Sequence, residues 1–422
     1  MVYDVIVAGG GPAGLGAAIS AAKMGAKTML LEGRSFFGGE ATLGLWMPIN
    51  RLFLLEGSRG GVHELLTSKL KSYKENISSF VPEDGNNGDG LYVHPEYFRL
   101  AAFELLEEAN CSYRLYSPVT GAIMEGDFIK GVEVTTKNGI QKYYGKVIID
   151  ATGDGDVAFH AGAKMVKGRE EDGQFMAHTL GFALCNVKVD KFLTYQRDHN
   201  DEFRSIYDNA SKEDYLTLKS YWGSKTTLPD VLTVNTSGFG LGRQDGTKAE
   251  DLTKSERDGL QVAIDFVRIA RNKKIPGLED CYLMRTGANI GVRETRRIVG
   301  EYVYKLEDAL EGKEFNDTIA RKYGAVDAVY YFAKMKQAAS YPYRCLLPLG
   351  VENLLVAGRC GSAEHLGHAA GKSMGNMMAL GQAAGISAAI CSKENITPRK
   401  VEVNKVQKRL IEIGVKGINQ SV

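Results

Sequence analysis

The sequence predicts an α/β fold in which a doubly wound domain with a parallel sheet is interrupted by an inserted α+β domain. A strand, a glycine-rich turn and a helix open the chain, and an apolar strand at residues 146–149 later runs into another glycine turn. After residue 348 the strand, glycine and helix pattern returns, whereas residues 166–340 carry longer amphipathic helices and more charge. We therefore expect 1–165 and 341–422 to form one discontinuous domain, and 166–340 to form a substrate or cap domain.

Composition favours a small-molecule partner. The chain has 422 residues, 44% of them hydrophobic, which is enough to bury a large core in two or three domains. The 52 basic and 51 acidic residues leave a net charge of +1, so nothing draws the chain toward nucleic acid or an anionic membrane. We expect neither partner, and a homo-oligomer is compatible with this composition.

The cysteines and the chain ends predict a cytoplasmic protein. Six cysteines lie far apart, and none forms a C-x-x-C pair, so we expect reduced, mostly buried thiols and no metal site. No stretch approaches the roughly 20 apolar residues that span a bilayer. No basic leader with a cleavage site opens the chain, so we expect neither export nor insertion, and no structural element before residue 3.

The opening segment predicts one βαβ unit with a nucleotide-binding turn. Strands are expected at 3–7 and 28–31, with a helix at 12–24 between them. Gly9 allows a tight turn, Gly11 lets a pyrophosphate approach, and Gly14 lets the helix pack on the sheet. The helix, which begins with Pro12 and Ala13, presents its N-terminus to the phosphates. The alternative is a glycine turn that merely closes the unit.

An acidic residue completes this motif. Glu32 ends the second strand, where a carboxylate accepts hydrogen bonds from a ribose and disfavours a 2′-phosphate. The rest of the chain predicts further elements by periodicity and turn residues. We expect helices at 62–73, 95–108, 254–272 and about 373–391, strands at 113–116, 119–124, 128–136, 140–144 and 353–357, and an exposed loop at 82–90.

Several later segments favour FAD over NAD. They are Asp150-Ala-Thr-Gly-Asp-Gly-Asp156, Asn353-Leu-Leu-Val-Ala-Gly-Arg359 with Gly381-Gln-Ala-Ala-Gly385, and the stretches 291–301 and 342–348. With the opening motif they resemble the FAD-dependent oxidoreductases of the glutathione-reductase-like superfamily, in particular a large bacterial family of mostly uncharacterised members. The resemblance spans the whole chain, and it implies a Rossmann-type domain that holds one FAD non-covalently.

The resemblance also implies which residues hold the cofactor. It places the turn at Ala151, Thr152, Gly153 and Asp154 near the FAD diphosphate, Gly358 and Arg359 at the ribityl and phosphate portion, and the backbone of Val119 by the adenine. Gly33 and Arg34 belong with Glu32 in the entry motif, and Gly39 is expected under the flavin, followed by Glu40, Ala41 and Thr42.

The final helix is expected to point its N-terminus at the flavin pyrimidine ring. A helix N-terminus carries partial positive charge, which stabilises negative charge on reduced flavin. The peptides expected there are Ser373, Met374, Gly375, Asn376 and Met377. Lys372 stands where close members of the family often have an arginine, and because it lacks a planar fork we do not expect it to bind a carboxylate as an arginine would.

A second glycine-rich stretch invites comparison with the first. Gly238, Gly240 and Gly242 follow a strand-like segment at 231–236, but the next helix begins only near Leu252. Because no helix terminus is within reach of a phosphate, a loop is expected here rather than a second NAD(P) site.

Two histidines are candidates for the chemistry. His365 and His368 lie between the Gly358 turn and the final helix, and an imidazole near the flavin can act as the base when hydride leaves an alcohol or amine. The alternative for each is a cofactor contact or a neutral core residue. His94, His178 and Tyr343 are weaker candidates.

Arg293 and Arg344 are the candidate anchors for an anionic substrate or an oxyanion. The alternative for both is an ordinary ion pair, for Arg293 with Glu294 or Glu301. Arg296 and Arg297 are expected on a solvated or interdomain face.

The sequence therefore predicts an FAD-dependent oxidoreductase that exchanges hydride between flavin N5 and a small polar organic substrate. Two alternatives stay open: a flavin-dependent monooxygenase, and an FAD-binding protein with a non-redox or RNA-modification role. Substrate, direction, electron acceptor and covalent attachment are not specified by these motifs.

Overall fold

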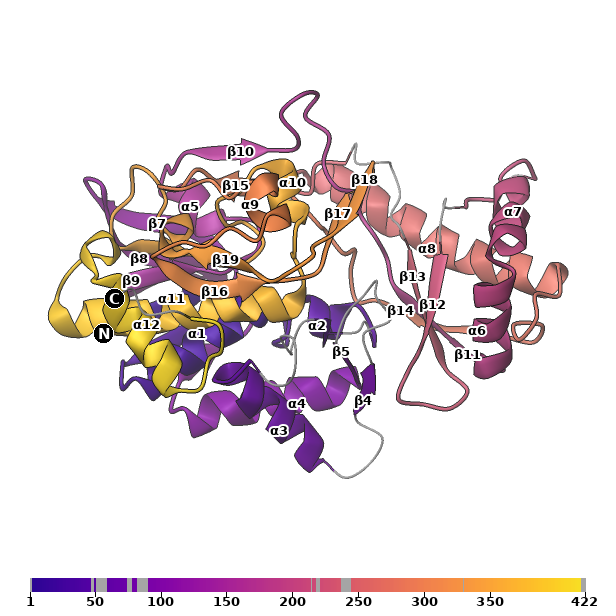
Figure 1. Cartoon of the computed structure of the whole chain (residues 1–422), viewed down its shortest axis with the longest axis horizontal. Coiled ribbons are helices and arrows are strands. Elements are labelled where there is room, and N and C mark those ends of the chain that lie inside the picture. Colours follow the sequence, from indigo (N-terminus) through magenta and orange to yellow (C-terminus); the bar gives the residue numbers. More distant parts are fainter. Residues whose placement is uncertain are drawn as a thin grey trace.

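The computed structural model describes residues 2–46, 49–50, 59–73, 78–81, 90–213, 215–217, 221–236, 244–328 and 330–418. Figure 1 shows a larger part built on a parallel sheet, at the left, and a smaller part with its own sheet and helices, at the right. Chain segments from the beginning, middle and end of the sequence contribute to the larger part.

The centre of the larger part is a parallel sheet. Its neighbouring strands are β6 (Ser112–Arg114), β2 (Thr28–Leu31), β1 (Val2–Ala8), β9 (Gly139–Asp150) and β20 (Leu354–Val356). β20 runs parallel to the end of β9, so residues near both ends of the chain share one sheet. The predicted α/β fold with a Rossmann-type sheet is confirmed.

An antiparallel extension continues this sheet. β7 (Val119–Glu125) pairs with β8 (Phe128–Thr136), which pairs with the first half of β9. The prediction of two separate strands at 140–144 and 146–149 is wrong, because β9 runs unbroken through both. Its first half alternates between exposed and half-buried residues and its second half is buried on both faces, so the pattern changes within a single strand.

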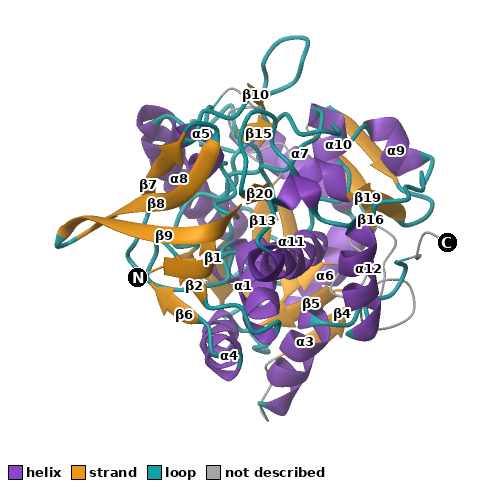
Figure 2. Ribbon diagram, turned by 90° about the vertical axis from the view of Figure 1, so that its left-hand side faces the viewer, coloured by secondary structure: helices purple, strands orange, loops and turns teal. Residues whose placement is uncertain are grey.

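Helices α1 (Pro12–Lys23) and α11 (Met374–Glu394) lie side by side against the sheet (Figure 2). Most residues of both helices are buried, which is typical of a helix without a polar face. Small residues let their backbones approach: a Cβ at Gly381 would lie 1.8 Å from the carbonyl oxygen of Ala13, and one at Gly16 would lie 2.4 Å from that of Met378.

Short helices and strands surround this core. Helices α3 (Val62–Ser72) and α4 (Pro95–Glu108) match the predicted helices at 62–73 and 95–108. The expected loop at 82–90 lies outside the described residues except for Gly90. The remaining elements of the larger part are α2 (Glu40–Leu43), β3 (Ile49–Asn50), β4 (Ser78–Val81), β5 (Gly90–Val93), α5 (Asp156–His160), β10 (Met165–Lys167), β15 (Arg296–Ile298), α9 (Leu306–Leu310), β16 (Thr318–Lys322), β17 (Ala325–Ala328), β18 (Tyr331–Lys334), β19 (Ala339–Pro342), η2 (Tyr343–Leu346), α10 (His365–Ala369), η3 (Pro398–Lys400) and α12 (Val403–Glu412).

The smaller part has an antiparallel sheet with its own apolar cluster, whose buried members run from Leu180 to Ile290. Buried residues from Tyr304 to Tyr343 pack instead with the core around α1 and α11. The domain limits at 166 and 340 stay a prediction. The elements of the smaller part are β12 (Tyr221–Lys225), β13 (Leu232–Thr236), β11 (Phe182–Cys185) and β14 (Tyr282–Thr286), in that sheet order, with α6 (Val189–Asp198), α7 (Asn200–Ala210) and α8 (Ala249–Asn272).

Two further predictions concern helix α8 and the cysteines. α8 begins at Ala249 rather than 254, and Glu250 and Asp251 in its first turn suit a helix N-terminus. All six cysteines are free and all but Cys185 are buried, which confirms the expected unpaired, mostly buried thiols. Among the described residues, no helix combines the length and the apolar character needed to cross a bilayer.

The α1–α11 contact gives a prediction about folding. Gly381→Ala places a methyl group against the backbone of Ala13, so we expect it to lower the free energy of unfolding by about 1–3 kcal/mol through overpacking. Denaturant unfolding followed by circular dichroism measures this change. Unchanged stability would show that the two helices are not packed this closely.

Candidate functional site

In the glycine turn between β1 and α1, the surrounding backbone leaves no room for a side chain at two glycines, whereas the third has free space beside it. Gly9 has a φ of 97°, and a Cβ there would lie 2.4 Å from the carbonyl oxygen of Ala151. A Cβ at Gly14 would lie 1.7 Å from the carbonyl oxygen of Gly9. The described atom nearest to a Cβ at Gly11 would be the Cα of Gly39, at 4.0 Å. The fold requires the first two glycines, and the third leaves space over the N-terminus of α1, where a phosphate is favoured.

Glu32 ties the end of β2 to this turn. Its carboxylate accepts hydrogen bonds from the N–H groups of Gly10, at 2.6 Å, and Arg34, at 2.8 Å. The N–H of Ser117 donates to the carbonyl of Glu32 at 2.9 Å, which brings the start of β7, at Val119, to the same edge of the sheet. The residues expected at the ribose and adenine therefore lie together.

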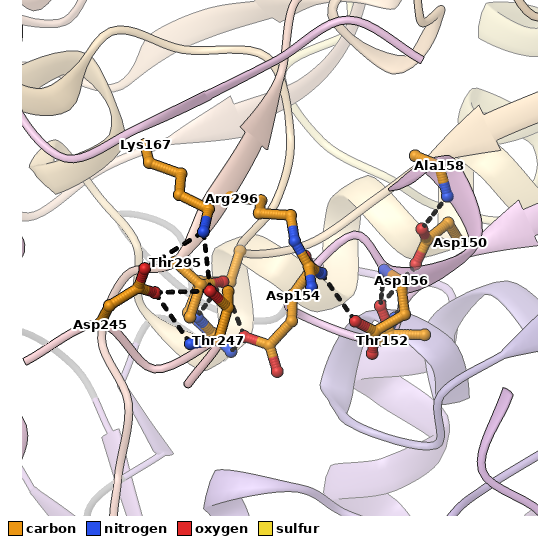
Figure 3. Close-up of polar contacts among 11 residues, drawn as sticks. Asp150, Thr152, Asp154, Asp156, Ala158, Lys167, Asp245, Thr247, Thr295 and Arg296 are labelled. Atoms are coloured by element: carbon orange, nitrogen blue, oxygen red, sulfur yellow. Dashed lines mark hydrogen bonds and ion pairs between the residues drawn. The ribbon is translucent and has the colours of Figure 1, made fainter. Parts of the chain in front are cut away.

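The middle motif folds around a buried carboxylate (Figure 3). Asp150 accepts hydrogen bonds from the Thr152 N–H at 3.0 Å, the Thr152 hydroxyl at 2.7 Å and the Ala158 N–H at 2.9 Å. Burial raises the pKa of Asp150. Burial and the carboxylates of Asp154 and Asp150 raise the pKa of Asp156 to about 6. These bonds hold the turn after β9 in one shape and start α5.

The middle and closing motifs meet in one ion pair. The Arg359 guanidinium contacts the Asp154 carboxylate at 2.5 Å, and the Thr295 hydroxyl donates to the same carboxylate at 2.7 Å. Arg296 donates to the Asp154 carbonyl at 2.9 Å and to Asp156 at 2.8 Å (Figure 3). Residues predicted to contact the diphosphate and the ribityl chain are thus joined directly, and Thr295 and Arg296 connect them to β15.

Helix α11 begins without a side-chain cap. Its N-cap residue is Ser373, whose hydroxyl is buried and has no hydrogen-bond partner within the described part of the chain. The first N–H groups of a helix have no partner inside the helix, and they carry partial positive charge. The start of α11 therefore suits a hydrogen-bond acceptor that carries negative charge, as the pyrimidine ring of a reduced flavin does.

Two side chains that the sequence reasoning missed support the first turn of α11. Arg59 donates to the side-chain oxygen of Asn376 at 2.6 Å, and His63 contacts the Gly375 carbonyl at 2.8 Å through Nε2. Burial lowers the pKa of His63 to about 3, so the neutral ring donates to that carbonyl. The only sequence signal for these residues is the glycine pair between them, Gly60 and Gly61, which precedes α3.

An ionic cluster lies next to the start of α11. Arg293 contacts the Asp327 carboxylate at 3.2 Å, and Lys372 contacts it at 3.3 Å while donating to the Asp327 carbonyl at 2.6 Å. Both cations hold the pKa of Asp327 down at about 2. The suggested pairing of Arg293 with Glu294 or Glu301 is wrong, because Asp327, distant in sequence, comes from β17.

The two candidate histidines are both buried on α10. His365 contacts the Glu294 carboxylate through Nδ1 at 3.0 Å, and its ring stacks on Tyr330 with centroids 5.9 Å apart. Burial lowers the pKa of His365 to about 4. His368 contacts the Arg293 carbonyl through Nε2 at 3.1 Å, and burial holds its pKa well below the ordinary value of a histidine. Both rings are neutral near pH 7.

Behind His365 stands a fully buried ion pair. Glu294 and Arg297 have no exposed side-chain surface and contact each other directly. Arg297 also donates to the carbonyls of Ala363 and Gly168, each at 2.9 Å. Of the two faces predicted for Arg297, solvated or interdomain, its full burial excludes the solvated one. Arg297 holds Glu294 in place beside His365.

Several other predicted residues lie elsewhere. Arg344 makes a bidentate contact with Asp317 at 2.9 and 3.1 Å, so the structure does not bring it to the other candidates. Tyr343 is buried and its hydroxyl donates to the Pro398 carbonyl. His94 caps α4, and the described contacts of His178 include a hydrogen bond of 2.9 Å to Ser255. The stretch at Gly238, Gly240 and Gly242 lies outside the described residues.

Glu40 lies near positive charges from three separate segments of the chain. Burial raises the pKa of its carboxyl, while the positive charges of Arg34, Arg359 and Arg293 act in the opposite direction. It starts α2, in which Ala41 and Thr42 are buried. Side chains of the entry motif, the closing motif and the ionic cluster thus act on one carboxyl group.

The residues present fit an FAD. The space at Gly11, the carboxylate of Glu32, the cation at Arg359 and the orphaned hydroxyl of Ser373 are chemically suited to phosphate, ribose and flavin, the parts of a dinucleotide expected at these positions. Within the described ranges, no group of three or more His, Cys, Asp or Glu side chains is arranged to hold a metal ion.

Comparison with known proteins points to the same cofactor. A family model described as FAD dependent oxidoreductase matches residues 4–410. Among curated proteins, the chain is similar to a digeranylgeranylglycerophospholipid reductase of Thermoplasma acidophilum, 28% identical over 44% of this chain and 48% of that protein. A reductase of the same name from Methanosarcina acetivorans is 28% identical over 36% of this chain and 38% of its own. The chain thus matches about half the length of these relatives or less.

Solved structures share the fold. A geranylgeranyl bacteriochlorophyll reductase-like protein from Thermoplasma acidophilum superposes with a TM-score of 0.50 at 16% identity, covering 97% of this chain and 83% of that one. A p-nitrophenol 4-monooxygenase from Pseudomonas putida gives a TM-score of 0.50 at 13% identity, covering 97% and 86%. Reductases and monooxygenases therefore share this architecture.

The glycine turn gives a prediction that separates cofactor contact from folding. Gly14→Ala clashes with the Gly9 carbonyl, so we expect lower stability with or without FAD. Gly11→Ala meets no described atom closer than 4.0 Å, so the apoprotein should keep its melting temperature while FAD affinity falls by about tenfold or more. Thermal unfolding and FAD titration measure the two effects. Equal destabilisation of the apoprotein by both variants would contradict this assignment.

Proposed function

The chain belongs to the FAD dependent oxidoreductase family, and we propose that it exchanges hydride between FAD and a small polar organic substrate. The flavin ring of bound FAD supplies a site that accepts or donates hydride. The observation that carries the proposal is the ionic cluster of Arg293, Asp327 and Lys372, which lies beside the neutral histidines of α10 and the start of α11. Charged groups for binding and neutral groups for proton transfer are therefore next to one another.

We propose that FAD lies along the crevice from Glu32 to Ser373, without a covalent bond. Support comes from the sequence of contacts: Glu32 and Val119 at one end, Gly11 and Arg359 in the middle, and the orphaned Ser373 hydroxyl at the start of α11. This arrangement, with motifs from both ends of the chain, supports the proposal that the chain belongs to the glutathione-reductase-like superfamily.

His365 is the proposed proton acceptor. Because the ring is neutral and its Nδ1 faces the Glu294 carboxylate, the proton is expected on Nδ1, which leaves Nε2 with a free lone pair. Arg297 fixes Glu294, and the Tyr330 ring lies against the imidazole, so the orientation of His365 is restricted on two sides. An Nε2 held in this way can take the proton that an alcohol or amine loses with its hydride.

Arg293 is the proposed anchor for an anionic group of the substrate. Its side chain is 22% exposed, and Asp327, which it shares with Lys372, is 49% exposed. Two cations face one carboxylate here, and the N-terminus of α11 adds positive charge. A substrate carboxylate or phosphate would find a net positive surface at this place.

A second candidate is reduction of an apolar chain, as the names of the curated relatives suggest for those proteins. The observation in its favour is exposed apolar surface on the edge strands of the smaller sheet, where Trp222, Tyr282 and Met284 are 45%, 52% and 45% exposed. Turnover of prenyl lipids in micelles, with no response to small polar metabolites, would favour this candidate.

The proposed function is tested by the reductive half-reaction. The FAD-loaded protein is mixed without oxygen with a panel of small hydroxy acids, amino acids and amines, and flavin absorbance is followed. Bleaching by one of these compounds supports hydride transfer from a small polar substrate. Absence of bleaching combined with rapid NAD(P)H oxidation dependent on an aromatic compound would support a monooxygenase instead.

The role of His365 predicts a rate loss and a pH profile. His365→Asn should slow anaerobic flavin reduction by about 10²- to 10⁴-fold, the usual contribution of a general base, with FAD content unchanged. In the unaltered protein the base is lost only as pH falls through a pKa of about 4, so the rate should stay constant between pH 7 and 5. His368→Asn is the control on the same helix. Equal effects of the two substitutions, or a rate that falls near pH 6.5, would contradict this role.

The role of Arg293 predicts opposite effects of two substitutions. Asp327→Asn removes the charge that competes for Arg293 and Lys372, so a small carboxylate such as benzoate should perturb the flavin spectrum at about tenfold lower concentration. Arg293→Gln should raise that concentration. Arg344→Gln, a cation paired with Asp317, should leave it unchanged. Tighter binding of an amine by the Arg293 variant would indicate a cationic substrate.

A further inference from the structure

Lys322 is a buried cation for which the described residues provide no carboxylate. It ends β16 with a relative exposure of 3%. Its ammonium group donates to the Gly367 carbonyl at 3.4 Å, and no ion pair involves it within the described part of the chain. Lysine is almost never fully buried without a paired charge, so a specific environment must hold it.

Two tyrosine rings provide that environment. The Lys322 nitrogen lies 4.6 Å from the centre of the Tyr304 ring and 5.3 Å from that of Tyr341. A cation over aromatic faces in a desolvated site is stabilised by the negative charge of the ring faces. The Tyr304 hydroxyl is itself buried without a partner among the described residues. The rings keep the charge in place but supply no negative charge to neutralise it.

Lys322 is the group at this buried site that changes charge near neutral pH. Burial lowers its pKa to about 7, and the positive charge of Lys372 acts in the same direction. The other titratable groups facing it are Tyr304, Tyr341, Cys345 and His368. Burial raises the pKa of the first three and lowers that of His368, so all four stay neutral. A nearby negative charge would therefore favour the charged form of Lys322.

Lys322 lies next to the loop that precedes α11. A Cβ at Gly371 would lie 3.4 Å from the Lys322 Cβ and 3.5 Å from its Cε. The Asn376 amide donates to the carbonyls of Gly371 and Tyr323, each at 2.9 Å, so β16, the loop before α11 and its first turn are bonded together. The charge of Lys322 is thus held at a fixed place behind the peptides expected to face the flavin.

We propose that Lys322 is a positioning charge for the flavin: together with the N-terminus of α11, it stabilises the negative charge that the pyrimidine ring gains on reduction. The inference rests on the proposed orientation of FAD along the crevice. Where Lys322 is neutral before reduction, it takes up one proton from solvent as the flavin gains charge, so the buried site stays electrically balanced. The missing counter-charge of Lys322 is then supplied by the reduced cofactor.

The test compares Lys322→Met with Lys313→Met in the FAD-loaded protein. Lys313 is a matched control, because it also lies over two aromatic rings, Tyr302 and Phe315, but it is 47% exposed and paired with Asp308. The readouts are the flavin midpoint potential and the dissociation constant of sulfite, an anion that binds flavins more tightly when positive charge lies near the pyrimidine ring. We expect Lys322→Met to lower the potential and weaken sulfite binding about tenfold or more, and Lys313→Met to change neither.

Two further measurements complete the test. Lys322→Arg keeps the charge and should restore most of the sulfite affinity. The ratio of sulfite affinities between unaltered protein and Lys322→Met should be largest below pH 7 and shrink above it, since the ionisation of sulfite cancels in the ratio. Unchanged potential and sulfite affinity in a Lys322→Met protein that still binds FAD would overturn the inference. Failure of the unaltered protein to bind FAD would instead overturn the proposed function.

Discussion

The backbone contact between α1 and α11 is the constraint on which the rest of the structure depends. Cβ atoms at Gly381 and Gly385 would lie 1.8 and 2.2 Å from carbonyl oxygens of α1, so these helices pack as closely as backbones allow. A Cβ at Gly358 would likewise lie 3.1 Å from that of Ala13. Because the helices are held together, the turn that precedes α1 and the turn that follows β20 lie next to each other. A dinucleotide site made from both ends of the chain follows from that contact.

The charges around the crevice divide into two kinds. Asp154 with Arg359 is a half-buried pair that joins segments distant in sequence. Glu294 with Arg297 is a buried local pair, and Arg297 joins it to distant segments through the carbonyls of Ala363 and Gly168. Breaking a buried pair of this kind is costly, because it leaves one charge without compensation. Lys322 is different, since tyrosine rings and a carbonyl hold it without a described counter-charge. Its position suits a site whose charge changes during the reaction.

The local parts of the fold could be predicted from the sequence. Gly14 and Glu32 are close in sequence to the groups they contact, so spacing alone indicates the turn and its carboxylate. The contact of Gly9 with Ala151 joins distant segments and has no such signal. The continuity of β9 was not predictable in this way, because the burial pattern of its residues changes partway along the strand. The helices α3 and α4 matched because each shows a regular apolar face.

The partners of the candidate catalytic residues could not be predicted from spacing. Asp327 contacts Arg293 from the β17–β18 hairpin, and Arg59 contacts Asn376, which is distant in sequence. Arg297 looks like a surface residue in the sequence, since it sits in a run of charged residues, yet it is buried. Such pairs depend on tertiary packing, and a single sequence carries no signal that one distant carboxylate rather than another will be the partner.

Hydrogen exchange with and without FAD tests the central claim most directly, because it reports on both ends of the chain at once. If one FAD is gripped by turns from both ends, its binding should slow amide exchange in residues 9–14 and in residues 373–377 together, at one FAD per chain. Protection limited to the opening turn, with the start of α11 exchanging as fast as in the apoprotein, would contradict the account.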